Sequence, residues 1–211
     1  MEKKEKENAP KEAPEVVEAK KMIGAYEGAF FPNTTIHLVI TKATPDSIEG
    51  ASVVAGHFTP FKGTVKKENG LFTIVAKEPG NDPTDGKFEF TIAVAKQDSL
   101  KGKWTPDSLT KKLTAVDFVL VKKPFTYVKE SGIYPFASSK EITSADIENL
   151  SEWETQVLKN EILARHGQIF TDVRLKEAFE SKTWYVPVAA DVQDSLTEVE
   201  KKNLSFLAEF K

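Results

Sequence analysis

Between about residues 21 and 123 the chain consists of short runs in which apolar and polar residues alternate. Alternation with a period of two is typical of β-strands that bury one face. In one run, Phe88, Phe90 and Ile92 fall on the face opposite Lys87 and Glu89. The pattern predicts eight strands, near residues 22–30, 34–42, 46–55, 58–67, 70–77, 86–95, 98–105 and 113–122.

Turn residues, not helices, separate these runs. Asn69-Gly70 is the strongest hairpin signal, because both residues tolerate the positive φ of a tight turn. Parallel strands need a long crossover, usually a helix, and no helical period in this region is long enough, so we expect an antiparallel meander. Eight such strands can close into a barrel and so remove the exposed edges. Closure requires the strand near Gly24–Phe30 to pair with the strand near Val116–Val121.

Helical signals replace the alternation after about residue 123. Two capping boxes, Ser151 with Glu154 and Thr197 with Glu200, mark helix starts. The predicted helices cover residues 144–149, a segment from 152 that stops at Gly167, 173–181 and 198–210. We therefore predict an α+β chain of two domains: a disordered tether at 1–20, an antiparallel eight-stranded meander β-barrel at 21–123, a linker at 124–140 and a small all-α domain at 141–211.

Composition argues against several classes of function. The formal net charge is -3, so there is no basic excess to neutralise nucleic-acid phosphates. The chain has no cysteine, which excludes disulfides and cysteine nucleophiles. No stretch approaches the ~18 apolar residues of a membrane span.

Residues 1–15 are charged and contain two prolines but no apolar signal segment. They fit a frayed terminus, or equally the spacer after a lipidated cysteine upstream of Met1.

One motif in the helical part is informative. Leu163-Ala164-Arg165-His166-Gly167 resembles the eponymous motif of the YARHG domain family, with Leu163 where the family usually has tyrosine. The similarity extends over about residues 140–210 and includes Leu150-Ser151, Asn160-Glu161, Leu175-Lys176, Trp184-Tyr185-x-Pro187 and Leu196-Thr197. That family occurs mainly in bacterial envelope and secreted proteins and has no established activity. The resemblance therefore implies an extracytoplasmic location, in the periplasm or at the cell surface.

Helical phase places an acidic residue on the apolar side of this helix. At about 100° per residue, Glu161 lies close to the centre of the apolar face. Arg165 follows at the i,i+4 spacing that lets the two side chains meet. An acidic residue in an apolar environment must be paired or neutralised. We therefore expect a buried Glu161–Arg165 pair, with Asn160 beside it and Trp184 and Tyr185 covering it.

Two interpretations of the motif remain open. In one, the motif is structural and depends on Asn160, Glu161, Arg165 and Gly167. In the other, an anion or a carbohydrate binds a surface formed by Arg165, His166, Trp184 and Tyr185. On the helical wheel His166 and Leu163 project away from the apolar face. If the family's tyrosine belongs to a surface site, its replacement by Leu163 weakens the second interpretation.

Other candidate sites are weaker. The histidines, His37, His57 and His166, lack ligand spacing, so we expect no metal and no other cofactor. The acidic loop between Pro79 and Gly86, with Asn81, Asp82 and Asp85, does not reproduce a calcium-loop pattern and is interpreted as a solvated turn. Gly102-Lys103-Trp104 resembles the G-x-W element of calycin-type, lipocalin-like barrels. It stands in the seventh strand instead of the first, which favours a core tryptophan.

Two classes of function follow from these observations, and both are non-enzymatic. In the first, a cell-envelope protein, anchored by lipid, binds a glycan, peptide or protein through its helical domain. In the alternative, the barrel is a lipocalin-like carrier of a small apolar ligand and the helical domain is accessory. A barrel filled with side chains favours the first class, and an open apolar cavity favours the second.

Overall fold

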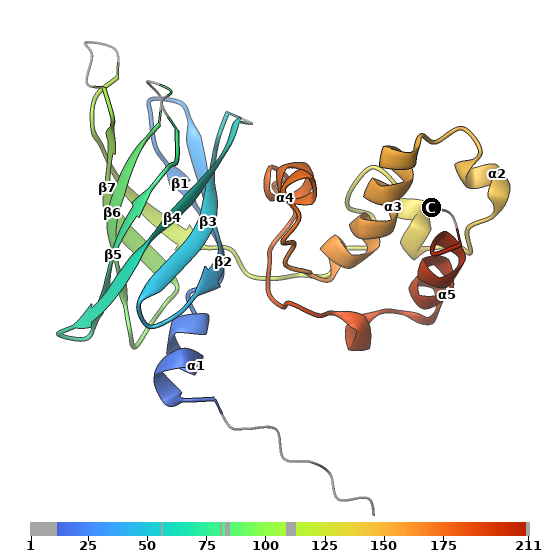
Figure 1. The fold of residues 1–211 in the computed structure, drawn as a ribbon, viewed down its shortest axis with the longest axis horizontal. Coiled ribbons are helices and arrows are strands. Elements are labelled where there is room, and N and C mark those ends of the chain that lie inside the picture. The colour runs from blue at the N-terminus through green and yellow to red at the C-terminus, as the bar shows by residue number, and fades with distance from the viewer. Residues whose placement is uncertain (1–11, 56, 81, 83–84, 109–112, 210–211) are drawn as a thin grey trace, which may run out of the picture.

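The computed structural model describes residues 12–55, 57–80, 82, 85–108 and 113–209. They form a barrel of strands followed by a helical region (Figure 1). The strands are β1 (Gly24–Ala29), β2 (Thr35–Ala43), β3 (Ser47–Val54), β4 (His57–Glu68), β5 (Leu71–Lys77), β6 (Gly86–Ala93), β7 (Ser99–Pro106) and β8 (Val116–Lys122). The helices are α1 (Pro14–Lys20), η1 (Pro135–Ser138), α2 (Ser144–Ile147), α3 (Glu152–Arg165), α4 (Val173–Glu180), η2 (Gln193–Ser195) and α5 (Glu198–Leu207).

The barrel is closed. Its strands pair antiparallel in sequence order, and β1 also pairs with β8. At this seam Tyr26 lies opposite Lys122, and Glu27 lies opposite Val121. The hairpin between β4 and β5 turns at Asn69-Gly70, where both residues have positive φ. The predicted eight-stranded antiparallel meander barrel is therefore confirmed, including the pairing of its first and last strands.

Apolar side chains fill the centre of the barrel. Along β6, Phe88, Phe90 and Ile92 are buried, whereas Glu89 between them is exposed. Every strand contributes to the resulting cluster, for example through Tyr26, Leu38, Ile48, Phe61, Ile74, Phe90, Leu100 and Leu120. Burying a side chain of this size is typically worth ~1.5–3 kcal/mol. The cluster is therefore the main source of stability for the barrel.

Helix α1 corrects the predicted disordered tether at residues 1–20. A proline in its first turn and charges suited to its two ends favour the helix locally. Ala19 and Met22 are fully buried in the barrel cluster, and the hydroxyl of Tyr26 donates to the carbonyl of Met22 at 2.9 Å. Helix α1 thus closes the barrel end at which β1 begins (Figure 1). Residues 1–11 of the predicted tether lie outside the described part of the chain.

Side-chain caps define the helices of the C-terminal region. Ser151 with Glu154 and Thr197 with Glu200 form the two capping boxes that the sequence predicts. Helix α3 ends at Arg165, one residue before its C-cap. Gly167 follows with a φ of +79°, a conformation that glycine adopts without strain. The helix start and stop signals were therefore correct.

The predicted linker at 124–140 is too long. From Ser131 onward the chain packs against α3 and α5, and η1 places Ala137 and Ser138 in the interior. These contacts shorten the connecting segment to residues 124–130, and within it Tyr127 still contacts the helical region through His166 and Glu200. The boundary at which each part folds by itself stays a prediction.

Candidate functional site

A pocket of about 450 Å³ lies at the barrel end opposite α1. This is the end at which β1, β3, β5 and β7 finish. Apolar side chains that line the pocket include Phe30, Val54, Phe88 and Trp104, and polar ones include Ser52 and Glu78. Its volume falls within the ~300–1,000 Å³ typical of small-molecule sites.

Glu78 is a buried carboxylate in the wall of this pocket. It follows β5, whose even-numbered residues face the interior, so strand phase directs its side chain into the barrel. Its Oε1 accepts a hydrogen bond from the hydroxyl of Ser52 at 2.5 Å. Its Oε2 accepts the backbone N–H of Gly86 at 2.9 Å and the indole N–H of Trp104 at 3.0 Å. Burial raises the pKa of Glu78 above its ordinary value.

Trp104 joins this carboxylate to an aromatic cluster. Its ring packs edge to face with Phe30 at 5.7 Å and with Phe31 at 6.0 Å between centroids. Trp104 is 4% exposed, so the interpretation of Gly102-Lys103-Trp104 as a strand with a core tryptophan is correct. The same side chain is also part of the pocket wall, which the sequence did not indicate.

In the loop after Glu78, Pro79, Gly80 and Asp82 are exposed, as expected of a solvated turn, but Asp85 is not. Asp85 is buried, and its Oδ2 accepts the backbone N–H of Asp82 at 3.0 Å. Besides burial, the charge of Asp85 raises the pKa of Glu78. Asn81, named with these residues above, lies outside the described part of the chain. Within the described residues, no group of three or more histidine or acidic side chains is placed to hold a metal ion.

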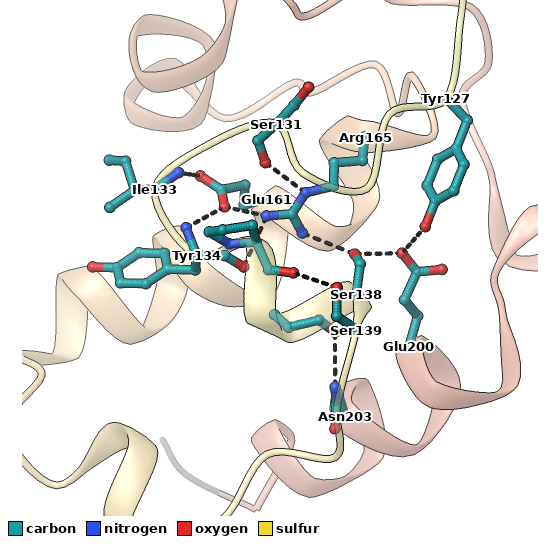
Figure 2. Close-up of polar contacts among 12 residues, drawn as sticks. Tyr127, Ser131, Ile133, Tyr134, Ser138, Ser139, Glu161, Arg165, Glu200 and Asn203 are labelled. Carbon is teal, nitrogen blue, oxygen red and sulfur yellow. Dashed lines mark hydrogen bonds and ion pairs between the residues drawn. The ribbon is translucent and has the colours of Figure 1, made fainter.

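The helical region contains a second buried polar cluster, centred on the Glu161–Arg165 ion pair (Figure 2). The carboxylate of Glu161 accepts the backbone N–H groups of Ile133 and Tyr134, both at 2.7 Å. Arg165 donates from Nε to the carbonyl of Ser131 at 2.7 Å and from Nη2 to that of Tyr134 at 2.9 Å. The pair therefore fixes the segment that precedes η1 against α3.

Ser138 connects this pair to Glu200 on α5 (Figure 2). Arg165 donates to the Ser138 hydroxyl at 2.9 Å, and that hydroxyl donates to Glu200 at 2.6 Å. Tyr127 also donates to Glu200, at 3.1 Å. Burial acts to raise the pKa of Glu200, but hydrogen bonds from Ser138, Thr197 and other donors outweigh it and hold the pKa below its usual range.

His166 is part of the same cluster, which corrects the outward direction predicted for it. Its side chain is 6% exposed, and Nε2 lies 2.8 Å from Glu200. Its ring stacks on that of Tyr127, with 4.4 Å between centroids. Leu163 does not project freely either, because it is partly buried against the apolar clusters of the helical region. Both residues serve packing inside the region.

Trp184 and Tyr185 do not cover the Glu161–Arg165 pair, as the sequence had suggested. They pack instead with Phe170 and Phe179 in a separate aromatic cluster. Residues 131–138 cover the pair, as the hydrogen bonds above show. Asn160 does not join it either, because its amide donates to the carbonyl of Gln156 on its own helix. Gly167 ends α3, as expected of the structural motif.

The structure therefore does not bring Arg165, His166, Trp184 and Tyr185 together as a surface. Arg165 is 2% exposed and Tyr185 equally so, and the hydroxyl of Tyr185 donates to the carbonyl of Gln168 at 2.5 Å. The four residues are divided between two interior clusters. An anion or a carbohydrate has no access to them as a group.

The fold places this protein in the class of two-part chains in which an antiparallel meander β-barrel is followed by a small helical domain. Residues 131–211 match the model of the YARHG domain, a span that contains the whole Glu161–Arg165–Glu200 cluster except Tyr127. The chain thus carries the C-terminal YARHG domain that the motif predicts, starting at residue 131 instead of about 140. YARHG domains are typical of extracellular proteins.

No curated protein and no solved structure matches the chain. In the described part of the chain, no helix has the length and hydropathy to cross a membrane.

Proposed function

We propose that this protein is a non-enzymatic, extracytoplasmic binding protein that holds a small ligand in the open end of its barrel. The pocket of about 450 Å³ beside Glu78 and Trp104 carries this proposal. Helix α1 covers the other end, so a ligand enters from one side only. The YARHG domain supports the extracytoplasmic location.

Packing inside the barrel limits the size of the ligand. Side chains of all eight strands fill the centre, and the pocket occupies only the end beyond Phe88 and Trp104. A long-chain lipid would need a cavity that extends down the barrel axis. We therefore propose a compact ligand, with one or two rings or a short aliphatic chain.

The helical region contributes stability and location in this proposal. Of the side chains that favoured a binding surface there, Arg165, His166 and Tyr185 are buried and hydrogen-bonded within the region, and Trp184 is partly buried in an aromatic cluster. These four side chains therefore do not support the first class of function, in which the helical region binds an envelope glycan, peptide or protein. Attachment by a lipid upstream of Met1 remains compatible with the barrel as the binding part.

A pair of matched tryptophan substitutions tests the site. Val54 lines the pocket, whereas Val119 on β8 is 64% exposed on the outer face of the barrel. Val54→Trp should fill the pocket, and Val119→Trp adds the same side chain outside it. The probe is N-phenyl-1-naphthylamine, an uncharged dye whose fluorescence rises in apolar sites.

We expect saturable fluorescence with the wild-type protein and with Val119→Trp, and little signal with Val54→Trp. Circular dichroism melts confirm that both variants are folded. Equal binding by Val54→Trp and wild type would show that the dye does not occupy this pocket. The absence of a saturable signal with the wild-type protein would contradict the proposed function.

A further inference from the structure

We propose that the pocket prefers an organic cation, namely a protonated amine with a compact apolar body whose ammonium group faces Glu78. This inference rests on the proposed function and specifies its ligand class. Three features of the pocket carry it: a buried carboxylate with neutral donors, a free acceptor position on that carboxylate, and aromatic rings next to it.

The first feature is the charge of the Glu78 carboxylate. Its hydrogen bonds come from a hydroxyl, a backbone N–H and an indole N–H, all of which are neutral. None of the described residues that line the pocket is lysine or arginine, and its histidine, His57, is exposed to solvent. Buried charges in proteins are normally paired with an opposite charge. A cationic ligand would supply the partner that the described wall of the pocket does not.

The second feature is the position left on the carboxylate. Each oxygen of an ionised carboxylate has two lone pairs. Among the described residues, Oε2 of Glu78 accepts from both Gly86 and Trp104, whereas Oε1 accepts from Ser52. Oε1 can therefore accept one more hydrogen bond. An ammonium group is the favoured donor, because hydrogen bonds between charged partners are roughly twice as strong as neutral ones.

The third feature is the aromatic wall. Phe30, Phe31 and Trp104 contact one another in edge-to-face pairs and all line the pocket. The faces of aromatic rings attract cations, tryptophan most strongly. The same rings provide apolar area for the body of the ligand. An amine with one or two rings matches both the charge and the apolar surface of this site.

Three naphthalene probes of similar size test the preference on the wild-type protein. They are 1-naphthylmethylamine, which is a cation near neutral pH, 1-naphthalenemethanol, which is neutral, and 1-naphthoate, which is an anion. Isothermal titration calorimetry gives their dissociation constants. We expect the amine to bind about tenfold or more tightly than the alcohol, and the carboxylate to bind weakest.

Glu78→Gln supplies the matched variant. It keeps the shape of the side chain and removes its charge, so affinity for the amine should fall about tenfold while affinity for the alcohol changes little. Equal affinities of the wild type for amine and alcohol, both abolished by Val54→Trp, would overturn the cation preference and leave the binding site intact. Failure of all three probes to bind would count against the proposed function itself. The wild-type series decides the question even if Glu78→Gln does not fold.

Discussion

Arg165 donates hydrogen bonds to four groups, and three of them belong to the segment from Ser131 to Ser138. The fourth is Glu161, which accepts two backbone N–H groups of the same segment. The planar guanidinium offers five N–H donors in a fixed geometry, which a lysine ammonium cannot reproduce. The conspicuous charges of the motif therefore hold a chain segment against α3. At the residue scale, the motif is structural.

A double-mutant cycle tests this structural role. Glu161→Gln and Arg165→Met should each lower the unfolding free energy by ~3–5 kcal/mol, because each leaves a buried charge without its partner. The double variant should lose less than the sum of the two. Chemical denaturation measures all four proteins. The exposed Glu198–Lys201 pair, 3.0 Å apart, is the control, and its removal should leave stability nearly unchanged. Wild-type stability of both single variants would contradict a structural role.

Glu180 on α4 should make stability depend on pH. It is 2% exposed, and its Oε1 has no hydrogen-bond partner in the described structure. Burial raises the pKa of Glu180 from 4.5 to about 7. Folding therefore favours the protonated form. The contribution of Glu180 to the free energy of unfolding is fully present below the unfolded pKa of 4.5. It is lost as the pH rises through the folded pKa of about 7.

Glu180→Gln should remove this dependence. Relative to wild type, the variant should gain up to ~3 kcal/mol in unfolding free energy between about pH 4 and pH 8, as the pKa difference requires. Glu177→Gln changes an exposed residue of the same helix and should show no such trend. Denaturation curves across this pH range measure both. A constant difference between Glu180→Gln and wild type would show that Glu180 titrates normally in the folded protein.

The strands and helices differ in how far the sequence alone predicts them. Strand phase was correct because strands such as β5 and β6 bury one face, and that produces a period of two. Helix α1 was missed because a helix of seven residues is too short to be stable by itself. Its stability comes from burial of Ala19 and Met22 in the barrel, a tertiary contact that local composition does not indicate.

Two identical substitutions in and before α1 test its role as an element of the barrel. Ala19 is fully buried in the barrel cluster, whereas Ala13 is exposed at the N-cap of the helix. Ala19→Asp buries an unpaired charge and should lower the melting temperature markedly. Ala13→Asp adds a favourable capping side chain and should be neutral or slightly stabilising. Equal melting temperatures would indicate that α1 does not pack in the barrel end in solution.

At the scale of the whole molecule, the barrel and the YARHG domain were predictable, and the contacts within each site were not. The sequence separates His166 from Glu200 by 34 residues, and Ser52 from Glu78 by 26. No local sequence pattern predicts either contact. For Glu78, the sequence indicates only the direction of the side chain, because the inward phase of β5 continues one residue past the strand. The wheel of α3 placed the ion pair correctly but could not show which segment covers it.

Limited proteolysis tests the revised boundary between the two parts. Lys129 is exposed in the connecting segment, whereas the carbonyl of Lys140 accepts a hydrogen bond from Asn203 at 2.8 Å. Trypsin should therefore cut after Lys129 before it cuts after Lys140. Mass spectrometry of the first fragments identifies the site. Early cleavage after Lys140 would place residues 131–140 back in a linker.

The central claim is that the small-molecule site lies in the open end of the barrel, and the three tryptophans of the chain test it directly. Trp104 lines the pocket, Trp153 lies under Arg174, and Trp184 packs on Phe179. In a ¹H–¹⁵N spectrum each indole N–H gives a separate signal. On titration with 1-naphthylmethylamine, or with 1-naphthalenemethanol if only the neutral probe binds, the Trp104 signal should move until saturation while the other two stay in place. Movement of Trp153 or Trp184 with an unchanged Trp104 would place the site in the helical region and contradict the account.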